Sequence, residues 1–282
     1  MNEIIKCDAK IIKSKSDTDV DFRLSVSKSK TFDSCKKKFK YNYIEKLPRK
    51  DWDFHIFGKF LHQVLENFHA KLLADRELEK DWSPVLDESW DEAKEEYKKD
   101  LTAQQEVDAA DIVDTYRDIL KEDGLPEIVS VEANFNIVLA DTVVLNGFID
   151  RVQVDPDGML HVADYKTTKD KKYLKDYFQL ETYAFALMLE NPEIKKMRAS
   201  YVMLRHNFDY LTEEFTREEI MGTVGQKFLD YAEKIKAERT WRAQPQFLCK
   251  FCDFVDTCQE GTDYLIRRGI IDKAPKVGLM KW

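Results

Sequence analysis

Between residues 127 and 167 the apolar residues alternate or form short runs rich in Val and Ile, a pattern typical of β-strands. Three strands are predicted, over Glu127 to Val138, Thr142 to Val154 and Met159 to Thr167. The segment Asp155-Pro156-Asp157-Gly158 matches a short hairpin loop, with proline at the first turn position and glycine free to adopt a left-handed conformation. The sequence therefore predicts a three-stranded meander.

The loop length has a consequence for the side chains near it. If residues 155 and 159 flank a three-residue loop, Asp150 lies opposite Asp164 and both side chains emerge on one face. A four-residue loop would place them on opposite faces. Lys166 shares the face of Asp164 because it lies two residues further along the same strand. Two carboxylates and one ammonium are thus expected to converge.

Two carboxylates in a partly dry pocket repel each other unless a cation joins them, and oxygen ligands favour a hard ion such as Mg²⁺ or Mn²⁺. Asp150 and Asp164 are therefore predicted to be metal ligands, with Lys166 offsetting charge in the transition state. The chemistry that this indicates is phosphodiester hydrolysis. The alternative is an ordinary Asp/Lys pair at an exposed strand end.

Two helices are predicted before the strands. Residues 27 to 46 have helical apolar spacing, with Ser27 as N-cap and Cys35 on the inner stripe. A second helix runs from Phe57 to Leu72, and three polar residues share a face beside its apolar stripe. These are His62, Glu66 and His69. Taken alone, His62 is more often a packing residue than a ligand.

The remaining elements are predicted from the same periodicities. The acidic stretch 83 to 122 reads as a helical insertion or cap whose charges face water. A helix over 174 to 190 places Gln179 and Tyr183 on one side, where they could contact phosphate or simply form a polar edge. Further elements follow, a strand at 198 to 205 and a helix at 217 to 238.

Cysteines stand close together only near the end of the chain, where Cys249, Cys252 and Cys258 lie in a short loop. With Cys35 they could form a four-thiolate site for Zn²⁺ or a [4Fe-4S] cluster. The long gap from Cys35 to Cys249 is unlike a compact zinc finger, so such a group would join distant parts of the chain. Cys7 is the spare thiol.

Charge is distributed unevenly although the net value is −8. Residues 23 to 50 hold ten Lys/Arg against two acids, whereas residues 75 to 124 hold 18 acids against seven bases. The basic segment also contains three aromatic residues, Phe39, Tyr41 and Tyr43. It suits single-stranded nucleic acid, with Lys36, Lys37, Lys38 and Lys40 as DNA-binding candidates. A solvated helix is the alternative.

No segment resembles a signal peptide, and no apolar run approaches the ~18 residues of a membrane span. We therefore expect a cytoplasmic, intracellular protein with no membrane partner. No Gly-x-x-x-x-Gly-Lys-Ser/Thr motif is present, so an ATP-driven motor is not expected in this chain.

Several short motifs together resemble those of RecB-type nucleases of the PD-(D/E)XK superfamily. In order, they are Gly58-x-x-x-His62-x-x-Leu65-Glu66, Gly147-Phe-Ile-Asp150-Arg151, Val162-Ala-Asp164-Tyr-Lys166-Thr167 and Gln179-x-x-x-Tyr183. The front segment, with Cys35, Phe39 and Tyr43, is similar to the subgroup that holds a [4Fe-4S] cluster, which includes CRISPR-associated four-cysteine exonucleases and the AddB nuclease domain. The resemblance covers about residues 24 to 66 and 127 to 260.

The resemblance implies an α/β fold, a restriction-endonuclease-like core with a mixed sheet flanked by helices, which cuts DNA with Mg²⁺ or Mn²⁺. It implies that His62, Asp150, Asp164 and the backbone carbonyl of Tyr165 hold the metal and that Lys166 is catalytic. It also implies catalytic positioning by Gln179 and Tyr183 and supporting roles for Glu132 and Glu66. The [4Fe-4S] cluster would be held by Cys35, Cys249, Cys252 and Cys258, although the spacing of the last two leaves zinc open.

We predict one nuclease domain made of four parts. They are an N-terminal helical part over 24–75, an acidic helical insertion over 76–125, a catalytic core over 126–245 and a cluster-binding part over 246–282. The predicted activity is that of an exonuclease on single-stranded DNA or DNA ends, acting 5′-to-3′ and partnered by a helicase, recombination or CRISPR protein. The alternatives are a structure-specific endonuclease and a non-catalytic single-strand-binding subunit.

Overall fold

The computed structural model of the protein describes residues 10–11, 22–50, 52–140, 143–171, 174 and 176–272; Cys7 lies outside them. The chain divides into two compact units. We call the described parts of Met1–Arg23 and Asp53–Leu229 the sheet unit, and the described parts of Leu24–Trp52 and Asp230–Trp282 the cysteine unit. Each is described by itself.

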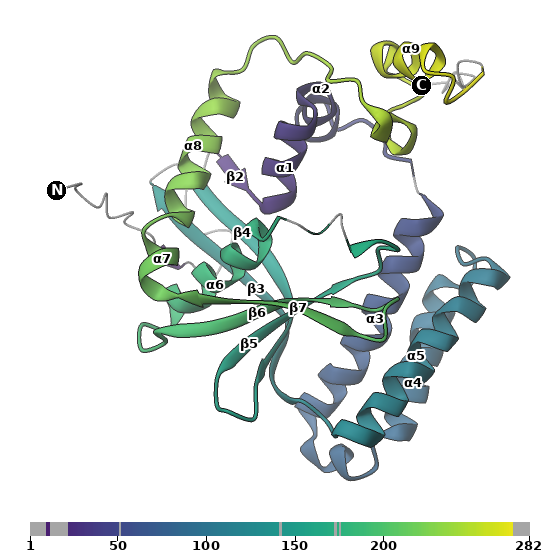
Figure 1. Cartoon of the computed structure of the whole chain (residues 1–282), viewed down its shortest axis with the longest axis vertical. Coiled ribbons are helices and arrows are strands. Elements are labelled where there is room, and N and C mark those ends of the chain that lie inside the picture. The colour runs from purple at the N-terminus through teal and green to yellow at the C-terminus, as the bar shows by residue number, and fades with distance from the viewer. Residues whose placement is uncertain are drawn as a thin grey trace. The chain divides into compact units, whose positions relative to one another are not determined.

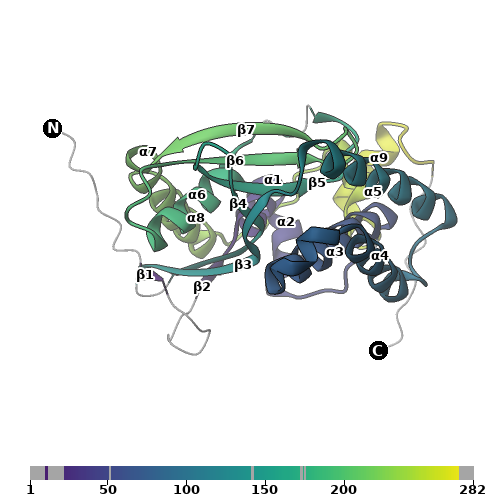
Figure 2. The ribbon, with the colours of Figure 1, turned by 90° about the horizontal axis from the view of Figure 1, so that it is seen from below.

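The strands belong to one mixed sheet. Their bounds are β1 Lys10–Ile11, β2 Phe22–Leu24, β3 Glu127–Ala140, β4 Val143–Val154, β5 Leu160–Lys166, β6 Lys196–Met203 and β7 Asp209–Thr216. The strand order is β1-β3-β4-β5-β6-β7, and β2 also pairs with β4. Only the β5–β6 pairing among these neighbours is parallel within the described residues. Strands β5, β6 and β7 run beside one another in Figure 2.

The meander predicted from the alternating pattern is confirmed, as β3, β4 and β5 pair antiparallel in succession. In the β4–β5 hairpin Arg151 pairs with Ala163 and Val154 with Leu160. The Asp155 amide donates to the Met159 carbonyl over 2.9 Å, and the Gly158 amide donates to the Asp155 carbonyl over 2.8 Å. The predicted register is therefore correct.

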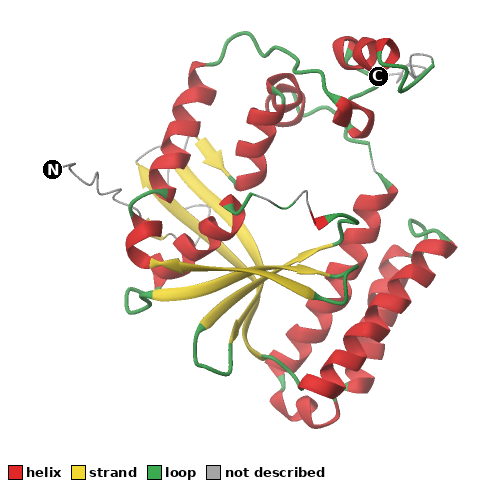
Figure 3. Cartoon of the chain, viewed as in Figure 1, coloured by secondary structure: helices red, strands yellow, loops and turns green. Residues whose placement is uncertain are grey.

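Helices flank the strands of the sheet unit on two sides (Figure 3). On one side lie α3 Asp53–Ala74, the 3-10 helix η2 Arg76–Asp81, α4 Ser83–Tyr97 and α5 Ala103–Asp123, and on the other lies α6 Phe178–Glu190. The helix predicted over 217 to 238 is in fact two, α7 Arg217–Met221 and α8 Val224–Ala237, interrupted at Gly222. The second of them spans the boundary between the units.

Helices α3, α4 and α5 lie side by side (Figure 1) and enclose most of the main hydrophobic cluster. The prediction of an acidic cap with charges facing water describes only the outer side of this segment. The acids do occupy the outer faces, but Leu86, Val113 and Leu120 are buried against α3. The acidic helices therefore supply part of the core, because each is amphipathic.

The cysteine unit begins with α1 Val26–Ser34, α2 Lys36–Phe39 and the π-helix η1 Lys40–Ile44. The single helix predicted over 27 to 46 is wrong, because Cys35 adopts an extended conformation that separates α1 from α2. The N-cap is Ser25 rather than Ser27, and its hydroxyl accepts from the Lys28 amide. Cys35 thus stands at a helix break, and not on an inner helical stripe.

The rest of the cysteine unit comes from the end of the chain, with the 3-10 helix η4 Phe247–Phe251 and the helix α9 Gln259–Arg267. Trp241 stacks on Phe39 at a centroid separation of 5.9 Å and meets Phe32 edge-on at 6.4 Å. This aromatic contact packs the N-terminal helices against the C-terminal segment. The helix α9 and the strand β7 were both absent from the prediction, since their apolar residues form no long periodic run.

None of the helices in the described ranges combines the length and the apolar character that crossing a bilayer requires.

The buried face of α4 gives a test of its place in the core. Leu86→Ala should lower the free energy of unfolding by about 2–5 kcal/mol, because it opens a cavity beneath a fully buried side chain. Val107→Ala on α5, which removes methyl groups from a residue that is 56% exposed, should change it by less than about 0.5 kcal/mol. Urea denaturation measures both. Equal stability of the two variants would contradict a core role for α4.

Candidate active site

The two central carboxylates sit on neighbouring strands of the sheet unit. Asp150 on β4 lies one step beyond the Arg151–Ala163 pair and therefore opposite Asp164 on β5. The Asp150 carboxylate accepts a 2.7 Å hydrogen bond from the Tyr165 amide, which ties β4 to β5 beside their paired segment. Burial, and then the neighbouring Asp164 carboxylate, raise the pKa of Asp150 to about 8.

Asp164 is 2% exposed and is surrounded by polar groups from β5 and α6. The Lys166 ammonium forms an ion pair with its Oδ2, while the Gln179 amide and the Tyr183 hydroxyl each donate to its Oδ1 over 3.0 Å. Gln179 also accepts from the Lys166 ammonium over 3.2 Å. Helix α6 therefore holds the acid and the lysine of β5 in one network, as the one-turn spacing of Gln179 and Tyr183 allows.

His62 approaches the same strands from α3. Its Nε2 lies 3.1 Å from the Tyr165 carbonyl oxygen and its Nδ1 lies 3.6 Å from Asp150 Oδ2. Burial lowers the pKa of His62, which favours the neutral imidazole that can act as a ligand. Gly58, one helical turn earlier, permits this approach, because a Cβ there would lie 3.1 Å from the Thr167 hydroxyl oxygen.

Two further acids lie within electrostatic range of this pair. Burial, followed by the charges of Asp150 and Glu66, raises the pKa of Glu132 to about 7. Burial also raises the pKa of Glu66. Glu132 has φ of 47° in the middle of β3, a left-handed conformation that non-glycine residues rarely adopt in a strand. The structure therefore brings both predicted supporting acids to the site.

The donor set formed by these groups is suited to a divalent ion. Within the described ranges, no three or more His, Cys, Asp or Glu side chains already have the arrangement of a metal site. The side chains instead contact one another: His62 lies beside Asp150, and Lys166 forms an ion pair with Asp164 Oδ2, which accepts no hydrogen bond from the described residues. Carboxylate and carbonyl oxygens with one imidazole fit Mg²⁺ or Mn²⁺ by their chemistry. The predicted ligands His62, Asp150, Asp164 and Tyr165 thus fit the ion, and the ion itself stays a prediction.

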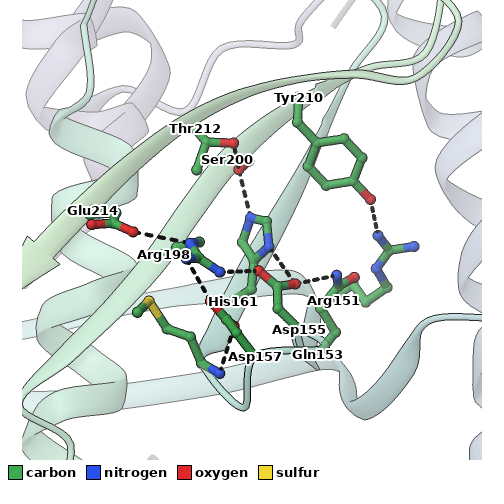
Figure 4. Close-up of polar contacts among 11 residues, drawn as sticks. Arg151, Gln153, Asp155, Asp157, His161, Arg198, Ser200, Tyr210, Thr212 and Glu214 are labelled. Atoms are coloured by element: carbon green, nitrogen blue, oxygen red, sulfur yellow. Dashed lines mark hydrogen bonds and ion pairs between the residues drawn. The ribbon is translucent and has the colours of Figure 1, made fainter.

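Behind the site, Arg151 is a buried cation held by aromatic residues, which sequence reasoning did not anticipate. Its guanidinium donates to the Tyr210 hydroxyl over 2.6 Å, seen in Figure 4, and to the Tyr116 hydroxyl over 3.3 Å. It also lies 5.5 Å from the centroid of the Tyr165 ring. His69 bridges the hydroxyls of Tyr116 and Tyr165 at 2.7 and 3.2 Å. These contacts fix Tyr165, whose backbone contacts both Asp150 and His62.

A second polar cluster lies at the β4–β5 hairpin (Figure 4). His161 lies 2.9 Å from Asp155 Oδ1 and 2.6 Å from the Ser200 hydroxyl oxygen. The order of groups is that of a Ser-His-Asp triad. Ser200 is fully buried, however, and its hydroxyl also forms a 2.8 Å hydrogen bond with the Thr212 hydroxyl. A nucleophile must reach its substrate, so this cluster is structural and clamps the turn that sets the register.

In the cysteine unit the four predicted cysteines are free thiols. A Cβ at Gly261 would lie 3.4 Å from Cys258 Sγ and 3.6 Å from Cys249 Sγ, so these two sulfurs border the same glycine. Backbone amides point at sulfur as well: Cys35 Sγ accepts from Lys38 at 3.4 Å, and Cys249 Sγ accepts from Gln246 at 3.3 Å. Amides directed at thiolate sulfur are a feature of iron–sulfur sites.

Three of the four lysines predicted to bind DNA are engaged in ion pairs. Lys36 pairs with Glu238 at 2.6 Å, Lys37 pairs with Glu260 at 2.6 Å, and Lys40 pairs with Glu45 at 2.9 Å. Lys38 donates its backbone amide to Cys35. Their role in DNA binding stays a prediction, and the ion pairs reduce the charge that they offer to a phosphate.

Comparison with known proteins decides the family. Residues 23–259 match the PD-(D/E)XK nuclease superfamily. The chain belongs to that superfamily. The RecB-type resemblance is confirmed by curated relatives, which are B subunits of ATP-dependent helicase/deoxyribonucleases. The match also extends across the acidic helices, which the sequence motifs alone had left outside the resemblance.

The relatives are much longer than this chain. The subunit of Streptococcus agalactiae serotype Ia is 27% identical over 179 residues, covering 60% of this chain and 17% of the relative. That of Streptococcus pyogenes serotype M3 is 27% identical over 154 residues, covering 50% and 14%. A candidate exonuclease from Eubacterium rectale has a crystal structure with a TM-score of 0.50 and 13% identity, covering 82% of this chain and 86% of that one. This last likeness concerns the fold.

The raised acid pKa values predict how stability depends on pH. Asp150 and Glu132 hold protons in the folded state up to about pH 8 and 7, whereas unfolded carboxyls lose them near pH 4. Folded protein then binds more protons than unfolded chain, so stability without metal falls as pH rises through this window. The lowered pKa of His62 has the opposite effect: below about pH 6.5 it makes stability rise with pH, because the unfolded chain binds the additional proton.

The measurement is the melting temperature in EDTA across this window, for the natural protein and for Asp150→Asn. The variant should be more stable than the natural protein at the alkaline end, by roughly 5 °C. Asp157→Asn is the matched control. Hydrogen bonds from Arg198 and from the Met159 amide hold the pKa of the exposed Asp157 carboxyl below its ordinary value. The control substitution should not flatten the slope of melting temperature against pH. An unchanged slope in Asp150→Asn would refute the raised pKa assigned to Asp150.

Proposed function

We propose that this chain is a divalent-metal-dependent deoxyribonuclease that hydrolyses phosphodiester bonds of single-stranded DNA or of DNA ends. The observation that carries the proposal is the meeting of Asp150, Asp164 and Lys166 with His62 in a PD-(D/E)XK domain. Packing of the core does not explain why two carboxylates, Asp150 and Asp164, lie side by side in a buried pocket. Their mutual repulsion is a cost that a bound cation would remove.

His62, Asp150, Asp164 and the Tyr165 carbonyl would hold the ion, which would supply Lewis acidity at the scissile phosphate. Lys166 carries a positive charge beside these ligands and can offset the charge that develops on phosphate oxygens. Gln179 accepts from that ammonium and so restrains its direction. Tyr183 and Gln179 restrain Asp164 from the α6 side, which leaves its second oxygen directed toward Lys166.

We further propose that Cys35, Cys249, Cys252 and Cys258 hold a [4Fe-4S] cluster, with Zn²⁺ as the alternative. Free thiols, two sulfurs bordering Gly261 and amides directed at sulfur support it. Burial raises the pKa of Cys252 and of Cys258, so both favour the neutral thiol until a metal is bound. The role of the cluster is structural, because it would close the long loop from Cys35 to Cys249.

We favour a 5′-to-3′ exonuclease as the form of this activity. It would act in DNA recombination, repair, degradation or CRISPR adaptation. The longer relatives combine helicase and deoxyribonuclease in their name, which supports a helicase as partner. The second candidate is a structure-specific endonuclease with the same chemistry. Circular single-stranded DNA separates them, because an exonuclease finds no end on it whereas an endonuclease cuts it.

The catalytic proposal is tested with Asp164→Asn, which keeps the shape of the side chain and removes its charge. Cleavage of an end-labelled single-stranded oligonucleotide with Mg²⁺ or Mn²⁺ should fall about a thousandfold or more, while DNA binding in EDTA is retained. Asp157→Asn, at a side chain that is 50% exposed on the hairpin, is the control and should cut normally. Undiminished cutting by Asp164→Asn, or binding without cutting by the natural protein in either metal, would defeat the proposal.

The cluster is tested with Cys249→Ser in anaerobically purified protein. Iron content, measured by elemental analysis, should fall to background, and the melting temperature should fall with it. Cys7→Ser is the matched control, since Cys7 is the predicted spare, and it should retain full iron. Zinc in place of iron would establish the alternative metal. An unchanged melting temperature with no metal in either protein would refute both the cluster and the zinc site.

A further inference from the structure

The cysteine unit presents a set of half-exposed aromatic rings beside lysines. Phe247 is 52% exposed and Phe251 is 43% exposed, at the two ends of the 3-10 helix η4. Trp52 lies next to Phe251, with ring centroids 6.1 Å apart and the planes at 77°. We call Phe247, Phe251 and Trp52, with Lys250 and Lys50, the aromatic row. Large exposed rings in a neighbouring set usually mark a binding surface.

Lysines stand between the rings of this row. The Lys250 ammonium lies 3.9 Å from the centroid of Phe247 and 4.7 Å from that of Phe251. The Lys50 ammonium lies 4.3 Å from the centroid of Trp52. Each ring of the row therefore has an ammonium group beside it, and the cation–π contacts keep the lysine stems against the rings.

Hydrogen bonds hold both segments of the row. The Trp52 indole N–H donates to Asp253 Oδ1 over 3.0 Å, which joins the row to the segment after Cys252. Helix η4 itself contains Cys249, whose amide donates to the Gln246 carbonyl over 2.9 Å. A row held by such contacts loses less conformational entropy on binding a partner than unrestrained side chains would.

The charge of the cysteine unit is opposite to that of the chain. Residues 24–50, 52 and 230–272 hold 16 Lys/Arg against 10 Asp/Glu, whereas the whole chain holds 45 against 53. A positive unit inside an acidic chain favours a polyanion at this surface. Rings with ammonium groups beside them suit single-stranded nucleic acid, which offers flat bases together with phosphates.

We propose that the aromatic row is a stacking surface for single-stranded nucleic acid. Bases stack on Phe247 and Phe251, and Lys250 and Lys50 pair with the phosphates that connect them. The inference rests on the proposed nuclease function for its choice of DNA as substrate, but it names a binding site apart from the acids of the sheet unit. An apolar protein partner would use the same rings without requiring their flat faces, and the test separates the two.

The experiment measures binding of a fluorescein-labelled oligothymidylate by anisotropy in EDTA, so that cleavage plays no part. The full-length variant with Phe247→Leu and Phe251→Leu keeps apolar side chains and loses both ring faces. Its Kd should rise roughly 5- to 100-fold. The variant with Phe247→Tyr and Phe251→Tyr keeps the rings and should bind about as tightly as the natural protein. Lys250→Gln should reduce the dependence of Kd on salt.

Leu248→Ala is the matched control, because Leu248 is 56% exposed on the same helix and has no ring. It should leave Kd unchanged. Equal Kd values for the leucine variant and the natural protein would overturn the proposal. A loss of affinity in Leu248→Ala as large as in the leucine variant would also overturn it, because it would indicate a general apolar surface for a protein partner. Asp164→Asn distinguishes the two proposals, since it should bind like the natural protein and fail only to cut.

Discussion

The pairing of β4 with β5 is the interaction on which the rest of the candidate active site depends. A shift of one residue would turn every side chain of one strand to the other face and would separate Asp150 from Asp164. The turn at Asp155 to Gly158 sets that register, and Gln153, His161 and Arg198 each form a hydrogen bond with the Asp155 carboxylate. The polar cluster at the hairpin therefore protects the geometry of acids at the opposite end of the same strands.

Buried charge is the second constraint. Arg151 is 1% exposed, and burying a cation is costly unless its donors are paired. Its two terminal nitrogens donate to tyrosine hydroxyls, whereas its buried Nε has no hydrogen-bond partner among the described residues. The residue next to it in sequence, Asp150, faces the site, because neighbours on a strand point to opposite sides. One dipeptide thus anchors β4 to the core on one face and supplies the acid on the other. The network through His69 and Tyr165 extends this anchor to β5.

The chemistry of the two units differs in kind. The sheet unit carries oxygen ligands that suit a hard, exchangeable ion, and the cysteine unit carries thiols that suit a permanent metal group. The aromatic row shares helix η4 with Cys249, so the proposed cluster and the proposed stacking surface would depend on the same short helix. If both proposed groups are bound, this difference in ligand type would keep the two metals from exchanging between the sites.

The sequence by itself determined the meander, its register and the position of the acids, because strand period and turn length are local properties that act through nearest neighbours. It also determined the family, since Asp150, Asp164, Lys166 and Gln179 keep fixed spacings. Tertiary structure alone decided the break at Cys35, the core role of the acidic helices, the strand β7 and the Arg151 network. Those features depend on partners distant in sequence, such as Trp241 against Phe39 and Tyr210 against Arg151, and no local pattern encodes such contacts.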